Sequence, residues 1–133
     1  MKKAYLSISF QKRKALQNEV VAIQQALSVF NIDLFVFVDQ YLFTKDQEKQ
    51  MMQQAFADIN SSDLLIAEVS EKAIGVGIEI GYAAAAQKPV IYLRNTQAEH
   101  STTAAGAANR VIIYENPEDL RKQLLAVLPE IIG

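Results

Sequence analysis

Short apolar runs alternate with amphipathic stretches along these 133 residues, and this alternation limits the possible folds more than any other feature. Residues 4–10 read as a strand, and residues 11–29 carry the apolar stripe of a helix. Residues 32–39 are almost continuously apolar, as in a strand that is covered on both faces. Further strands are predicted at residues 64–69, 89–93 and 111–114. A chain that alternates strands and helices in this way forms a parallel sheet with helices on both faces.

The sheet should have the flavodoxin-like strand order 2-1-3-4-5, because short connections and right-handed crossovers leave few other arrangements. We expect residues 1–133 to form a single domain of this α/β class. Ligands of such sheets bind beyond the carboxyl ends of the strands, near the order reversal between the first and third strands. That crevice should collect Ser7, Ser9, residues 39–41, residues 68–79 and the segment after Leu93.

Two helix starts are marked by residues that cap backbone N–H groups. Thr44 and Gln47 have the spacing of a capping box, which would open the second helix. Asn116 followed by Pro117 is typical of a cap and a first helical position, and would open the last helix.

Composition excludes several classes of function. The formal net charge of −2 leaves no basic excess for a general nucleic-acid binder. The sequence has no cysteine, so it has neither a disulfide nor a thiolate nucleophile, and its single His100 cannot form a histidine metal cluster. No apolar run approaches the roughly 20 residues that cross a bilayer. The N-terminal residues alternate like a strand and lack a signal-peptide cleavage site, so we expect a cytoplasmic protein.

Glu79 is the only charged residue between Lys72 and Lys88, and small or apolar residues surround it. A solvent-facing helix of that length carries several charges, and a buried one excludes them because an unpaired carboxylate is costly to desolvate. Gly75 and Gly77 suggest a tight strand-to-helix turn that would place Glu79 in the first helical turn, near the positive end of the helix dipole. An isolated carboxylate in apolar walls favours a catalytic role. The alternative is an acid that only stabilises its own helix.

The glycines around Glu79 do not have the spacing of a dinucleotide-binding turn. In that fingerprint the third glycine follows the second by three residues, and this chain has Ile80 there. The turn also follows the third strand instead of the first. A phosphate-receiver domain is disfavoured too, because the third strand lacks an acceptor aspartate and the first strand lacks an acidic pair. The first loop lacks the phosphate cradle of a flavodoxin.

Three segments, residues 62–70, 75–83 and 88–93, resemble the nucleoside 2-deoxyribosyltransferase family, and in particular its 2'-deoxynucleoside 5'-phosphate N-hydrolase branch. The resemblance continues more weakly through residues 101–106 and covers about the C-terminal three-fifths of the chain. It implies that Glu79 is a nucleophile that attacks the anomeric carbon of the sugar, and it implies no metal or organic cofactor. A close carboxylate stabilises or traps the oxocarbenium character that develops as an N-glycosidic bond breaks.

The resemblance also assigns roles to residues outside the glycine segment. Tyr5 matches a tyrosine of the family that would hydrogen-bond Glu79 and orient it. The family's second acid, which protonates the departing base, falls on Ala55. Asp58 lies almost one helical turn later and is the candidate that would replace it. Glu68, near the end of the third strand, is a candidate for sugar or base contacts.

Phosphate recognition departs from the family pattern. The serine expected before the glycine segment is Ala73, and the glycine-rich stretch after the first strand is replaced. Ser9 and Ser101 match the family and would hold a 5'-phosphate or a hydroxyl group, and Ser101 lies in a segment that family members offer to a neighbouring subunit. Positive charge in place of the lost hydroxyl groups would come from Lys12, Arg13 or Lys72. The expected substrate site is completed by Ser7, Gly75 and Gly77.

The function expected from this resemblance is an N-glycosidase that acts on (deoxy)nucleosides or their 5'-monophosphates, with water or a second base as acceptor. Its partners would be that small molecule and copies of itself, in a homodimer or larger homo-oligomer, and not a nucleic-acid polymer or a membrane. A non-catalytic nucleotide-binding module is the alternative, and Ala55 supports it. A fainter resemblance of residues 6–10 and 62–66 to TIR-type domains suggests an NAD glycohydrolase as a further alternative.

Overall fold

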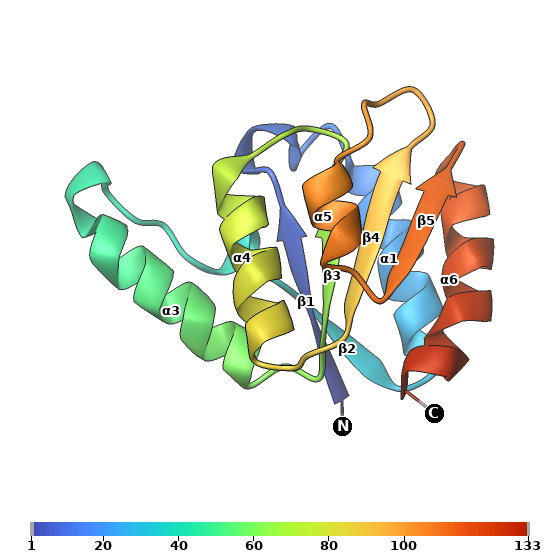
Figure 1. Ribbon diagram of the computed structural model, residues 1–133, viewed down its shortest axis with the longest axis horizontal. Coiled ribbons are helices and arrows are strands. Elements are labelled where there is room, and N and C mark those ends of the chain that lie inside the picture. The colour runs from blue at the N-terminus through green and yellow to red at the C-terminus, as the bar shows by residue number, and fades with distance from the viewer. Residues whose placement is uncertain (1, 133) are drawn as a thin grey trace.

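The computed structural model describes residues 2–132, in which five parallel strands form a sheet of order β2-β1-β3-β4-β5 (Figure 1). This arrangement confirms the predicted α/β class and strand order, and it places the order reversal between β1 and β3. The strands are β1 (Lys2–Ile8), β2 (Ile32–Val36), β3 (Leu64–Glu68), β4 (Val90–Asn95) and β5 (Arg110–Tyr114).

Helices cover both faces of this sheet (Figure 1). On one face lie α1 (Gln17–Ser28) and α6 (Pro117–Ile132), and on the other lie α3 (Glu48–Asn60), α4 (Ile74–Ala85) and α5 (Thr102–Gly106). Shorter helical turns occur at η1 (Phe10–Lys12), α2 (Phe37–Gln40) and η2 (Lys45–Gln47). Within residues 2–132, no helix combines the length and the apolar character that a membrane span requires.

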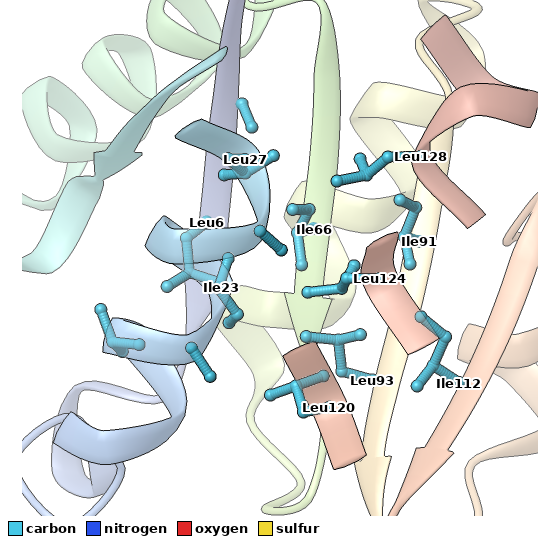
Figure 2. Close-up of a cluster of buried hydrophobic side chains, with 14 of the residues drawn as sticks. Leu6, Ile23, Leu27, Ile66, Ile91, Leu93, Ile112, Leu120, Leu124 and Leu128 are labelled. Atoms are coloured by element: carbon cyan, nitrogen blue, oxygen red, sulfur yellow. The ribbon is translucent and has the colours of Figure 1, made fainter. Parts of the chain in front are cut away.

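Side chains alternate between the two faces along each strand, and this alternation divides the core into two layers. Figure 2 shows the layer next to α1 and α6, where Leu6, Ile66 and Leu93 of the sheet meet side chains of both helices. The layer next to α3, α4 and α5 contains Tyr5 and Leu65. Because both faces are covered, every residue of β3 is buried, which explains why the strand sequence is nearly continuous in apolar residues.

Both predicted helix starts are confirmed. Thr44 and Gln47 form a capping box, in which the Gln47 side chain accepts a hydrogen bond from Thr44 N at 2.9 Å. The box opens η2, which leads directly into α3. Asn116 Oδ1 accepts a hydrogen bond from Asp119 N at 2.8 Å, and Pro117 is the first residue of α6.

The prediction of a strand over residues 32–39 is wrong at its end, because β2 stops at Val36 and α2 follows. Phe37 packs there against Tyr5 and Tyr41, whose ring centroids lie 6.0 and 5.1 Å from its own. A short apolar run has the same composition in a buried strand and in a buried helical turn, so its pattern does not locate this boundary.

Candidate active site

Glu79 lies in the second turn of α4. The helix begins at Ile74 and has no acidic residue in its first turn, so the prediction that Glu79 belongs to the first turn is wrong. Gly75 and Gly77 do not form a turn before the helix, because both are helical residues without positive φ. The helix dipole acts mainly within the first turn, so this carboxylate depends on side chains for its stabilisation.

Two hydroxyl groups of β1 hold the Glu79 carboxylate. Tyr5 and Ser7 are two residues apart on the strand, so their side chains point to the same face of the sheet. Tyr5 Oη donates a hydrogen bond to Glu79 Oε2 at 2.7 Å, and Ser7 Oγ donates to Glu79 Oε1 at 2.5 Å. Each carboxylate oxygen keeps a further lone pair for another partner, while the two donors fix its orientation.

Burial raises the pKa of Glu79, and the hydrogen bonds from Ser7 and Tyr5 oppose that rise because they stabilise the ionised form. The pKa of Tyr5 is raised as well, first by burial and then by the negative charge of Glu79. Tyr5 therefore remains a protonated hydrogen-bond donor. For Glu79, burial favours the neutral form and the two hydroxyl donors favour the ionised form.

Glu79 lines a pocket of about 500 Å³, which we call the main pocket because it contains this carboxylate. The pocket is also lined by Ser9 and Gln11, which follow β1, and by Glu71 and Lys72, which follow β3, so it lies where the strand order predicts a ligand. Most of its wall is apolar, with contributions from Phe10, Phe37, Met51 and Met52. Among residues 2–132, no cluster of three or more histidine, aspartate or glutamate side chains is arranged to hold a metal ion.

Ser9, Gly75 and Ser101 all lie at or beside this pocket. Ser9 and Gly75 line it directly. Ser101 lines a smaller pocket of about 100 Å³, together with Gly77, and the two pockets share Glu71. Ser101 Oγ also caps α5 by accepting a backbone hydrogen bond. A third and larger hollow, of about 720 Å³, adjoins η1 and is lined by Arg13 and Asp39, whose charges already pair with each other.

Glu71 is a second carboxylate in the main pocket, and the sequence reasoning did not identify it. It lies in the loop between β3 and α4, and its Oε1 accepts a hydrogen bond from Ser9 Oγ at 2.7 Å. No periodic pattern fixes the direction of a loop side chain. The available signal was its position within residues 68–79, the segment expected at the crevice.

Asp58 lies beside the site but does not line the pocket. Its carboxylate accepts hydrogen bonds from Tyr41 Oη at 3.0 Å and from Gln54 Nε2 at 3.1 Å. Its charge is close enough to Tyr5 to help raise the pKa of that tyrosine. Ala55, one turn earlier on α3, is fully buried.

Glu68 and Glu79 lie on opposite faces of the sheet. Glu68 belongs to the layer of α1 and α6, where it is buried and accepts hydrogen bonds from Tyr114 Oη at 2.6 Å, Ser70 Oγ at 2.9 Å and Ser70 N at 2.7 Å. Burial raises its pKa against the effect of these hydrogen bonds. Glu68 does not line the pocket that contains Glu79.

Residues 5–121, which are most of the chain, match the family described as Nucleoside 2-deoxyribosyltransferase. A curated relative from Syntrophotalea carbinolica, named as a 2'-deoxynucleoside 5'-phosphate N-hydrolase, is 40% identical over 60 residues. That match covers 45% of this chain and 37% of the relative, which is well under two thirds of the relative's length.

Solved structures of several proteins share the fold. The CMP N-glycosidase of Clostridium botulinum aligns with a TM-score of 0.66 at 22% identity, over 92% of this chain and 98% of that one. A 2-deoxyribosyltransferase from Bacillus psychrosaccharolyticus aligns with a TM-score of 0.68 at 16% identity, over 92% and 95% of the two chains. At these identities the likeness establishes the fold alone.

Proposed function

The chain belongs to the nucleoside 2-deoxyribosyltransferase family of enzymes, and from this premise we propose that it cleaves the base–sugar bond of (deoxy)nucleosides or their 5'-monophosphates. The observation that carries the proposal is the Glu79 carboxylate, which is held by Tyr5 and Ser7 and lines a pocket of about 500 Å³. A carboxylate that is fixed by two donors and open to a pocket is suited to attack a bound sugar.

The proposed reaction has two steps. In the first, a Glu79 oxygen bonds to the anomeric carbon while the bond from that carbon to the base nitrogen breaks, and the bonding electrons leave with the base. The base takes a proton from a nearby acid. In the second step, water or a nitrogen of a second base attacks the anomeric carbon and displaces the Glu79 carboxylate, and the attacking group gives its proton to the deprotonated acid, which restores it. Water as acceptor gives a hydrolase, and a second base gives a transferase.

Tyr5 and Ser7 act as positioning residues in this proposal. Their hydrogen bonds hold both oxygens of Glu79 in one orientation, so the carboxylate needs no reorganisation before it attacks. They also counter the effect of burial on the pKa of Glu79 and so favour the ionised nucleophile.

Asp58 is retained as the candidate acid for the departing base. Asp58 accepts a hydrogen bond from Tyr41 Oη, and the Tyr41 ring packs 5.1 Å from the ring of Phe37, which lines the pocket. Each carboxylate oxygen of Asp58 accepts one hydrogen bond, from Tyr41 or from Gln54, and keeps a further lone pair that can carry a proton for the base.

The pocket walls suit the two ends of a nucleoside. Phe37 and Met52 offer apolar surface to a base, and Ser9 offers a polar group to the sugar or to a substituent on it. Ser101 and Gly77, in the adjoining smaller pocket, would contact the same end of the substrate.

We further propose that the chain forms a homodimer or a larger homo-oligomer. Ile74 and Ile78 are 84% and 47% exposed, and their spacing of four residues aligns them on one face of α4. Gly77 and Gly81 are exposed on the same helix, so a neighbouring subunit could approach it closely. An exposed apolar helix face of this kind is typical of a surface that another chain covers.

A non-catalytic nucleotide-binding module is the second candidate, because Ala55 supplies no acid where the family has one. The two functions are separated by incubation with a panel of deoxynucleosides, ribonucleosides, their 5'-monophosphates and NAD, with and without a free acceptor base, followed by chromatography of the released base. We expect base release from at least one nucleoside or nucleotide and its loss in Glu79→Gln. Binding without turnover would favour the module, release from NAD alone would favour the TIR-type alternative, and full activity of Glu79→Gln would refute the nucleophile.

A further inference from the structure

Within residues 2–132, the carboxylates that line the main pocket are Glu71 and Glu79. Glu71 follows β3, and its Oε1 accepts a hydrogen bond from Ser9 Oγ at 2.7 Å. We propose that Glu71 is a specificity-determining residue that disfavours a 5'-phosphate and selects substrates with a free hydroxyl group at that end. The inference rests on the proposed function and chooses between the two substrate classes that it leaves open.

The charges around Glu71 leave little attraction for a phosphate. In the described part of the chain, the charged residues that line the pocket are Glu71 and Glu79, which are negative, and Lys72, which is positive. Lys72 Nζ lies 3.1 Å from Glu99 Oε2, and Lys12 Nζ lies 3.8 Å from Glu71 Oε2. Both ammonium groups therefore already face a carboxylate. A phosphate monoester would bring a further charge of about −1.5 to −2 into this environment at neutral pH.

The hydrogen bonds around Glu71 also disfavour a phosphate and favour a hydroxyl group. The Ser9 hydroxyl donates its only hydrogen to Glu71, so that hydrogen is not offered to a phosphate oxygen. An ionised Glu71 is an acceptor only, and phosphate oxygens are mainly acceptors, so the two groups repel one another. A sugar hydroxyl has a hydrogen to donate, and the free lone pairs of Glu71 can accept it.

The residues that line the pocket support this placement of the sugar. The apolar wall formed by Phe37, Met51 and Met52 suits a base, which leaves the polar substituents of the sugar to the side of Ser9 and Glu71. Since the proposed nucleophile Glu79 lines the same pocket, a sugar bound there can present its anomeric carbon to Glu79 and its hydroxyl groups to Glu71.

The test compares affinities in a Glu79→Gln background, which stops base release and keeps the side-chain shape. Isothermal titration calorimetry measures the binding of each of the four 2'-deoxynucleosides and of its 5'-monophosphate. We expect the tightest-binding nucleoside to bind at least about tenfold more tightly than its monophosphate, and we expect Glu71→Gln to reduce that ratio by at least about tenfold. The control is Glu115→Gln, which removes an exposed carboxylate that does not line the pocket and should leave the ratio unchanged.

Several results would overturn the proposal: tighter binding of the monophosphate, a ratio that Glu71→Gln leaves unchanged, the same change in Glu115→Gln, or no binding of either ligand. Base release by the otherwise unaltered protein is measured separately by chromatography. If no base is released but the affinity ratio changes as expected, the proposed function fails and the role of Glu71 stands. If base is released and the ratio does not change, the role of Glu71 fails alone.

Discussion

Tyr5→Phe tests whether the hydroxyl groups of β1 set the proton affinity of Glu79. Phenylalanine keeps the ring, which packs 5.9 Å from Phe35 and 6.0 Å from Phe37 between centroids, and removes the Oη that donates to Glu79 at 2.7 Å. A hydrogen bond to a charged group contributes about 1.5–3 kcal/mol. Because Ser7 still donates to the carboxylate, we take the lower end, which corresponds to roughly 1 pKa unit.

The direction of the change follows from the causes of the Glu79 pKa. Burial raises it and the hydrogen bonds from Ser7 and Tyr5 lower it, so the loss of the Tyr5 donor raises it further. In the proposed mechanism Glu79 attacks the sugar in its ionised form, so activity should rise as the pH increases through this pKa. The acid limb of kcat/KM against pH should therefore move to higher pH by roughly 1 unit in Tyr5→Phe. The assay is base release, followed by chromatography across the acid and neutral range.

Tyr114→Phe is a matched control, because Tyr114 Oη donates to a different carboxylate, that of the buried Glu68, on the opposite face of the sheet. It removes the same chemical group at a similar depth and should leave the acid limb in place. An acid limb that stays where it is in Tyr5→Phe would refute the reasoning. An equal shift in both variants would also refute it, because the effect would then reflect general loosening of the core.

Three further changes test other parts of the structure. Asp58→Asn should lower kcat by at least about tenfold if Asp58 protonates the departing base, and unchanged kcat in the same base-release assay would exclude that role. Burial raises the pKa of Glu68 above its unfolded value, so its contribution to stability is present at low pH and is lost as the pH rises through the folded pKa. Glu68→Gln cannot ionise, so the free energy of urea unfolding of this variant, relative to that of the unaltered protein, should increase as the pH rises above the usual range of a glutamate pKa. The opposite trend would contradict this. Ile78→Glu should shift the oligomer to monomer in analytical ultracentrifugation, with Val29→Glu at another exposed site as the control; an unchanged assembly would exclude the α4 face.

Much of the fold could be predicted because the sheet repeats one physical pattern. Strands covered on both faces are nearly all apolar, and the capping residues Thr44 and Asn116 mark where helices begin. The short elements could not be predicted. The predicted strand over residues 4–10 is wrong at its end, because β1 stops at Ile8, and the predicted helix over residues 11–29 is wrong at its start, because η1 comes first and α1 begins at Gln17. Residues 37–40 form a helical turn where the sequence pattern predicts the end of a strand. The conformation of these short segments depends on tertiary packing, which leaves no repeating pattern of apolar residues in the sequence.

The candidate site could be predicted where regular elements carry it. Glu79 stands out as a lone charge on an apolar helix, and the period of a strand places Tyr5 and Ser7 on one face. The same period separates Glu68 from them, but only once the register of β3 against β1 is known. Glu71 could not be predicted in this way, because a loop residue gains its direction from a single contact, here the hydroxyl group of Ser9.

Glu68 and Glu79 together show why hydrogen bonding alone does not identify a catalytic carboxylate. Glu68 and Glu79 each accept a hydrogen bond from a tyrosine hydroxyl and from a serine hydroxyl, and burial raises the pKa of both. They differ in access: Glu68 is sealed beneath α1 and α6 at 1% exposure, and Glu79 lines the main pocket. Of the two, only Glu79 is open to a ligand in that pocket. For that reason the matched pair Tyr5→Phe and Tyr114→Phe separates the chemistry of the site from the stability of the fold.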